Sequence, residues 1–205
     1  MYKRQLLLHA EAVAASAQQL DEQLLGLRDP DEAAGRLRLG ASTTLAQYVL
    51  PAWLPAFQAR YPRVQLSLLN VNSERIAEAL LRGELDLGFV EGRTKNRDLH
   101  YELLLPDELV AVRQPTPAGS PPRPLPLAEV LASPLVLRER GSGTLDVLET
   151  ALRERKIKLG ELKTAIYLDS TEAIKTYLEA APGAVGFVSR QALRRELAAG
   201  LLEEI

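Results

Sequence analysis

The stretch of chain that decides the fold runs from residue 35 to residue 44 and reads GRLRLGASTT. Apolar residues alternate with basic ones in its first half, which predicts a β-strand over residues 37–41. Three hydroxyl residues follow, and helical spacing of apolar residues begins at Leu45. The stretch therefore indicates a strand, a polar loop and the start of a helix, which together form the repeating unit of an α/β protein.

The rest of the chain repeats this order. Further strands are predicted over residues 64–70, 85–91, 99–105, 108–112, 135–138, 164–168 and 184–188. Helices are predicted over residues 45–61, 74–82, 145–155, 171–180 and 191–199. Pro51 and Pro55 should kink or split the first helix. Strands that alternate with helices favour parallel sheets covered on both faces. The elements divide at about Pro106, which predicts two α/β lobes with a ligand-binding cleft between them.

The first thirty residues carry a different pattern. Seven apolar residues recur in steps of four and three, namely Leu6, Ala10, Val13, Ala17, Leu20, Leu24 and Leu27. A period of 3.5 is typical of a helix that pairs with another helix. Residues 1–30 are therefore predicted to form a linker helix that joins two chains. The alternative is an amphipathic helix that folds back onto its own domain.

Composition excludes several classes of protein. The 205 residues are 46% hydrophobic, enough for the core of one or two domains, and the net charge of −2 gives the chain no general affinity for nucleic acid. Without cysteine there is neither a disulfide scaffold nor a thiolate metal site. No catalytic triad, metal-ligand cluster or P-loop is present, so we expect no enzyme activity and no cofactor. Neither a signal peptide nor a membrane span is visible, which favours a cytoplasmic protein.

Polar residues gather in the loops that follow four of the predicted strands. They are Ser42, Thr43 and Thr44, then Asn72 and Ser73, then Ser142 and Thr144, and finally Ser170 and Thr171. Gly143 lies between Ser142 and Thr144, where a glycine permits close approach of the backbone to a ligand. Loops that follow parallel strands emerge at one edge of a sheet, where helix N-termini favour an anion. Arg93 and Arg140 could pair with that anion through their guanidinium groups. The alternatives are that the polar residues only cap helices and that both arginines are surface charges.

Taken in order, these motifs resemble the effector-binding domain of LysR-type transcriptional regulators. The resemblance rests on GRLRLGASTT at residues 35–44, LLRGELDLG at 80–88, RGSGT at 140–144, STEAIK at 170–175 and GFVS at 186–189. It implies a two-lobed, periplasmic-binding-protein-like fold of type 2 preceded by a long linker helix. Lobe I would span residues 36–106 and lobe II residues 107–205, and the four polar loops would hold the effector. Asp86, at the start of a strand in lobe I, is expected to hydrogen-bond nearby backbone.

The resemblance also implies a function. A small effector, either an oxyanion or a carboxylate, would bind between the lobes of a homodimer or homotetramer. The bound state would be transmitted to a helix-turn-helix that contacts DNA. Family members carry that domain before the linker helix and a segment that returns to lobe I after lobe II, and both are expected outside residues 1–205. No membrane partner is expected. A stand-alone solute-binding protein of a transporter, or an enzyme on the same fold, remains as an alternative.

Overall fold

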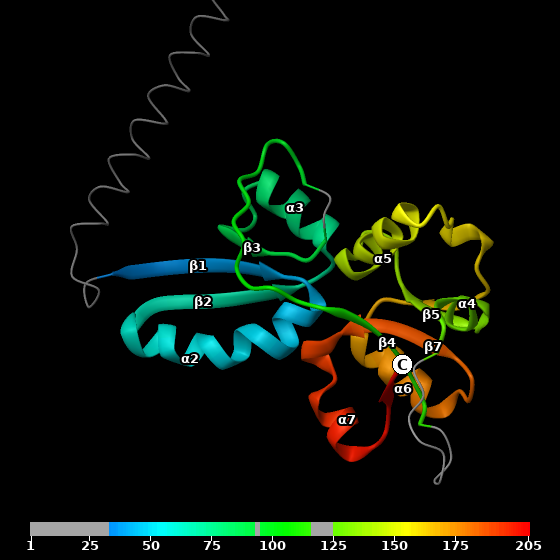
Figure 1. The fold of residues 1–205 in the computed structure, drawn as a ribbon. Helices are drawn as coiled ribbons and strands as arrows, with labels where there is room; N and C mark the ends of the chain where they lie inside the picture. Colours follow the sequence, from blue (N-terminus) through cyan, green and yellow to red (C-terminus); the bar gives the residue numbers. More distant parts are fainter. Residues whose placement is uncertain (1–32, 93–94, 116–124) are drawn as a thin grey trace, which may run out of the picture. The chain divides into compact units, whose positions relative to one another are not determined.

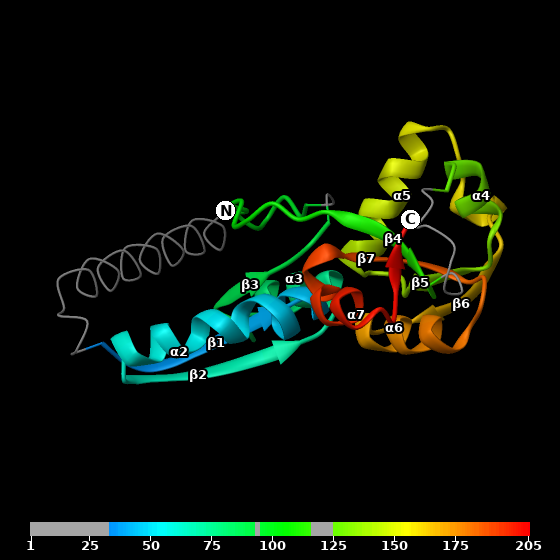
Figure 2. The ribbon, with the colours of Figure 1, turned by 60° about the horizontal axis from the view of Figure 1, so that its bottom comes forward.

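The structure is a computed structural model, and it describes residues 33–92, 95–115 and 125–205 (Figures 1 and 2). The predicted linker helix at residues 1–30 and the candidate residue Arg93 lie outside this described part.

Backbone packing divides the described chain into two units. The first comprises residues 33–36 and 54–66, and within it the rings of Phe57 and Tyr61 pack with their centroids 4.8 Å apart. The second comprises residues 37–53 and the described residues from 67 onward. Every loop residue predicted to bind the effector lies in this second unit, except Arg93.

The first sheet has three strands in the order β2-β1-β3. The strands are β1 (Ala34–Ala41), β2 (Arg63–Asn70) and β3 (Leu87–Phe89), and helix α3 (Ser73–Leu81) lies between β2 and β3 in the chain. β1 pairs in parallel with β3, with Leu39 opposite Leu87. Asp86 accepts a hydrogen bond from the backbone N–H of Arg38 at 2.7 Å, which confirms its predicted role. The Arg38 guanidinium also bonds this carboxyl and lowers its pKa to about 2.

The helix predicted over residues 45–61 splits in two, as its prolines suggested. Residues Leu45–Val49 form η1, a π-helix, and Leu50–Arg60 form the α-helix α2. The N–H of Leu50 bonds the carbonyl of Leu45, a wider turn than that of an α-helix. Pro51 has no N–H to give to the preceding turn, so the regular ladder cannot run through this point. The wide turn lies directly after the Ser42–Thr44 loop.

The second sheet has five strands in the order β6-β5-β7-β4-β8. They are β4 (Leu109–Arg113), β5 (Leu135–Arg138), β6 (Thr164–Leu168), β7 (Val185–Ser189) and β8 (Glu203–Glu204). β5 runs parallel to β6 and β7, but β4 runs antiparallel to β7 and β8. The prediction of purely parallel sheets is therefore wrong for this sheet. Alternating hydrophobicity shows that a strand is buried but says nothing about the direction of its neighbours.

Helices cover both faces of the second sheet (Figures 1 and 2). They are α4 (Leu127–Ala132), α5 (Gly143–Glu154), α6 (Thr171–Ala180) and α7 (Arg194–Ala199), with the 3₁₀ turns η2 (Leu159–Glu161) and η3 (Arg190–Ala192). Successive residues of β5 serve opposite faces, because side chains alternate along a strand. Leu135 and Leu137 pack with residues of α4 and α5. Val136 packs on the other face with Ile174 and Leu178 of α6.

Two predictions need correction, and two short elements were missed. Residues 99–105 form no strand, and Leu103 is 88% exposed. These residues have a composition that favours strands, but they pair with no strand of the described chain. Strand formation depends on such a neighbour. The helix predicted over residues 191–199 is instead the turn η3 followed by α7. Helix α4 and strand β8 were not predicted, since both are short and β8 consists of two glutamates.

Candidate functional site

The polar loops of the second unit meet one another. The N–H of Glu74, at the start of α3, donates to the carbonyl of Gly141 at 3.2 Å. The Asn72 amide donates to the carbonyl of Arg140 at 3.4 Å, and the Ser73 hydroxyl donates to the carbonyl of Glu91 at 3.0 Å. The loop before α3 therefore lies against the loop before α5, although about 70 residues separate them in the chain.

A buried arginine joins the remaining two loops. Arg138, the last residue of β5, has only 2% of its side chain exposed and pairs with the Glu139 carboxylate at 2.8 Å. Its guanidinium donates to the Thr43 hydroxyl at 3.2 Å, to the Thr171 hydroxyl at 3.4 Å and to the Asp169 carbonyl at 3.3 Å. This residue was missed by sequence reasoning. The available signal was a charged residue that ends a continuous apolar strand, at the edge where α/β sheets bind ligands.

A partly buried carboxylate lies among the same loops. Glu91 accepts a hydrogen bond from the Thr144 hydroxyl at 3.4 Å. Burial raises the pKa of the Glu91 carboxyl, while the hydroxyls of Thr44 and Ser42 act in the opposite direction. The negative charge of Asp107 raises this pKa further, and the positive charge of Arg138 lowers it. Glu91 was also missed, and it too follows the end of a strand.

The Glu91 carboxyl makes folding dependent on pH. Its pKa is higher in the folded chain than in the unfolded chain, where it has the ordinary value of 4.5. The stability associated with the protonated form is therefore complete below pH 4.5 and is lost as the pH rises through the folded value. We expect Glu91→Gln to be more stable than the parent at pH 8 and equally stable at pH 4, as measured by urea unfolding. A difference that is the same at both pH values would contradict this assignment.

Helix capping explains some of the predicted polar residues and leaves others unexplained. Asn72 accepts from the N–H of Arg75, and Ser170 accepts from the N–H of Ala173, each at 3.1 Å. These two side chains are ordinary N-caps. The hydroxyls of Ser42, Thr44 and Ser142 are buried, and none of them makes a hydrogen bond of normal geometry within the described chain, although those of Ser42 and Thr44 lie close enough to Glu91 to lower its pKa. Buried hydroxyls normally find a partner, so a structural role alone does not account for these three.

A cavity of about 300 Å³ opens beside these loops. Its lining is mainly polar and consists of Thr43, Gln47, Asn70, Val71, Asn72, Arg75, Glu139, Asp169 and Ser170. Three of the predicted residues, Thr43, Asn72 and Ser170, are therefore part of its wall. The lining carries one cation and two carboxylates, and Glu139 is already paired with Arg138. The carboxylates were not anticipated by the sequence, which pointed to an anion site built from neutral donors and arginines.

The remaining predicted residues have other positions. Arg140 is exposed. Gly143 lies against the backbone of Glu91, because a Cβ built on this glycine would come within 2.2 Å of the Glu91 carbonyl oxygen. The close approach predicted at Gly143 is thus made by another part of the chain. Ser73, Thr144 and Thr171 bond to Glu91 or Arg138, as given above.

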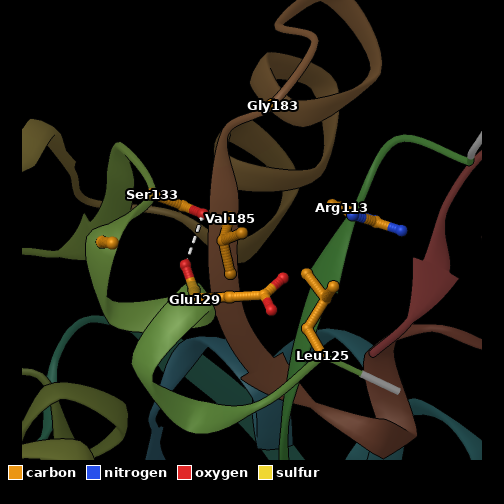
Figure 3. Close-up of a pocket in the computed structure, with 7 residues that line it drawn as sticks. Arg113, Leu125, Glu129, Ser133, Gly183 and Val185 are labelled. Carbon is orange, nitrogen blue, oxygen red and sulfur yellow. Dashed lines mark hydrogen bonds between the residues drawn. The ribbon is translucent and has the colours of Figure 1, made fainter. Parts of the chain in front are cut away.

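A second cavity, of about 340 Å³, lies elsewhere on the five-stranded sheet (Figure 3). Arg113, Leu125 and Glu129 are among its lining residues, and the Arg113 guanidinium pairs with Glu203 at 2.7 Å. None of the predicted effector residues lines it. The polar loops therefore favour the first cavity as the candidate site.

The described residues offer no candidate for a metal site or for a membrane-spanning helix. No group of three or more His, Asp or Glu side chains could hold a metal ion there. In that same part of the chain, no helix is long and apolar enough to cross a membrane.

Comparison with known proteins agrees with this arrangement of two sheets. The solved regulatory domain of CcmR from Synechocystis PCC6803, in complex with 2-PG, superposes with a TM-score of 0.70 at 29% identity, over 83% of this chain and 79% of that one. The fold is the two-lobed, type 2 periplasmic-binding-protein-like fold of such domains. Residues 30–205 match the family described as the LysR substrate binding domain. The chain belongs to this family.

Curated relatives extend the comparison. The HTH-type transcriptional regulator YeiE of Escherichia coli K12 is 33% identical over 97% of this chain. CysL of Bacillus subtilis, also an HTH-type transcriptional regulator, is 29% identical over 80% of it. The chain spans 65% of YeiE and 53% of CysL. These relatives favour a regulator's effector-binding domain over a solute-binding protein of a transporter.

Proposed function

We propose that this chain is the sensing part of a LysR-type, DNA-binding transcriptional regulator and that it binds a small effector at the cavity beside Thr43. Residues 36–106 and 107–205 would be its two lobes, and residues 1–30 the linker helix of a homodimer or homotetramer. DNA would be contacted by a domain outside this sequence, in the cytoplasm, and no reaction would be catalysed. The family match and the transcriptional regulators among the relatives support this reading.

One observation carries the proposal of a ligand. Ser42 and Thr44 follow β1, Ser142 precedes α5, and all three hydroxyls are buried without a hydrogen bond of normal geometry in the described chain. Glu91 contacts the loop of Ser142 through Thr144 and Gly143, and the hydroxyls of Ser42 and Thr44 lower its pKa. Unpaired buried hydroxyls destabilise a fold, so such a cluster is retained where a bound molecule can pair with it.

The charges around the cavity define the chemistry of the effector. Arg75, the helix N-termini at Asn72 and Ser170, and the hydroxyl groups favour an oxyanion or a carboxylate. Asp169 adds an acceptor in the lining of the cavity, which favours an effector that also carries a hydroxyl or a protonated oxygen. The CcmR domain was solved in complex with 2-PG, and this supports a small ligand of comparable size.

Titration calorimetry on the 205-residue chain tests the proposal. The panel is sulfate, sulfite, phosphate, nitrate and small carboxylates with and without a hydroxyl group. We expect Thr44→Val and Ser142→Ala each to weaken binding about tenfold, since a hydrogen bond to a charged group is worth roughly 1.5–3 kcal/mol. Ser142→Ala should melt at or above the temperature of the parent, because it removes an unpaired buried hydroxyl.

Ser133→Ala is the matched control for Ser142→Ala. Its hydroxyl bonds the Glu129 carbonyl at 2.9 Å beside the second cavity, so binding should not change. The proposed site is wrong if no member of the panel binds, or if Ser133→Ala weakens binding as much as Ser142→Ala does.

A further inference from the structure

A buried lysine joins helix α6 to the turn η3 and helix α7. Lys175 of α6 has 4% of its side chain exposed, and its ammonium has three oxygen partners. It lies 2.8 Å from Glu172, 2.7 Å from Glu196 of α7 and 3.0 Å from the carbonyl of Ala192 in η3. A lysine ammonium has three donors, so all of them are used.

Tyr48 of the π-helix η1 completes this cluster. Its ring lies under the Lys175 ammonium, 4.9 Å from centroid to nitrogen, and its hydroxyl donates to the Glu172 carboxylate. Burial raises the pKa of Tyr48 to about 12, so the hydroxyl keeps its proton at physiological pH. Tyr48 lies in η1, which follows strand β1 of the first sheet in the chain. The other members of the cluster belong to α6, η3 and α7.

The cluster adjoins two of the effector loops. Tyr48 is four residues after Thr44, and Glu172 directly follows Thr171. If the Ser42–Thr44 loop moves relative to the start of α6, the contacts of Tyr48 must break. The contacts of Lys175 with Glu196 and Ala192 can persist, because all three residues belong to the same part of the chain. Tyr48 lies in the single π-helical turn η1, and such turns are frequent at functional sites.

We infer that Tyr48, Glu172 and Lys175 form a latch that sets the distance between the Ser42–Thr44 loop and the N-terminus of α6, and so tunes effector affinity without touching the effector. Tyr48 is a positioning residue in this arrangement. The inference rests on the proposed function for its effect on affinity, but the latch itself can be measured without any ligand. Effector binding and latch formation favour the same arrangement of the loops, so each strengthens the other.

The substitution that separates the latch from simple packing is Tyr48→Phe. It removes the hydroxyl that bonds Glu172 and keeps the ring under Lys175. Tyr177→Phe is the matched control, since Tyr177 lies on α6, the helix that carries Glu172 and Lys175, and is 36% exposed. Hydrogen exchange of the ligand-free chain should be faster in residues 42–49 of Tyr48→Phe and unchanged in Tyr177→Phe. The melting temperature should differ little between the two variants.

Affinity gives the second readout, with sulfate and phosphate as probes. Tyr48→Phe should bind them three- to tenfold more weakly, which corresponds to the loss of about one hydrogen bond. Glu172→Gln keeps an acceptor for the Tyr48 hydroxyl and should lose less than Glu172→Ala. In a double-mutant cycle, Tyr48→Phe with Glu172→Ala should be no weaker than Glu172→Ala alone.

The outcomes distinguish this inference from the proposed function. Unchanged exchange in residues 42–49 of Tyr48→Phe would overturn the latch. Faster exchange with unchanged affinity for a bound probe would overturn its role in positioning. If neither probe binds the parent chain, the proposed anion site fails, and faster exchange in Tyr48→Phe alone would still support the latch.

Discussion

Arg138→Met is expected to destabilise the chain by about 3–5 kcal/mol, the range found when one partner of a buried ion pair is removed. The substitution keeps most of the apolar length of the side chain but removes every donor. The Glu139 carboxylate, the hydroxyls of Thr43 and Thr171 and the carbonyl of Asp169 would all lose a partner. Thermal and urea unfolding measure this loss.

Arg140→Met is the matched control, because Arg140 is exposed and lies only two residues further along the chain. A surface change of this kind should alter stability by less than about 0.5 kcal/mol. Adding Glu139→Gln to Arg138→Met should restore part of the loss, since the unpaired carboxylate is then gone. Equal stability of Arg138→Met and Arg140→Met would show that the buried network does not form.

Gly143→Ala is expected to separate the start of α5 from the segment at Glu91. The added Cβ would stand 2.2 Å from the Glu91 carbonyl oxygen and 2.4 Å from its carbonyl carbon. Both atoms belong to the backbone, so the two segments must move apart. The loss of stability should be about 1–3 kcal/mol, as for other overpacked sites. Binding of sulfate or phosphate should weaken about tenfold or more, because the hydroxyl-bearing loops no longer meet.

Gly160→Ala serves as the control for this substitution. Gly160 lies in the 3₁₀ turn η2, and a Cβ there meets no atom within 4 Å. We expect this variant to match the parent in melting temperature and in affinity for the probes. A Gly143→Ala chain that also matches the parent would contradict the close approach of Glu91 and Gly143.

The strands and helices of the second sheet could largely be predicted from local pattern. β5, β6 and α6 have the bounds that alternation and helical spacing predicted, and α5 and β7 differ by one or two residues. These elements are buried on one side or on both, so their apolar residues recur with the period of the element. Residues 99–105 have similar composition but form no strand, because strand formation also needs a neighbour.

Some residues of the candidate site could be predicted from the sequence, and others could not. Capping residues such as Asn72 and Ser170 could be placed from sequence, because an N-cap and its helix are adjacent in the chain. Arg138 and Glu91 could not, because burial of a charge depends on partners far along the chain. Arg138 and Thr43 are 95 residues apart, and Glu91 and Thr144 are 53 residues apart.

Sequence alone determined most of the strands and helices, that polar loops follow the strands, and which family the chain resembles. Periodicity and capping are local properties, and they persist whatever surrounds them. Only the tertiary structure decided that β4 runs antiparallel, that carboxylates stand beside the predicted anion site, and that Tyr48 reaches Lys175. Each of these three features depends on which groups, far apart in the chain, are buried together and pair with one another. That pairing is set by the packing of the whole fold and not by any single stretch of it.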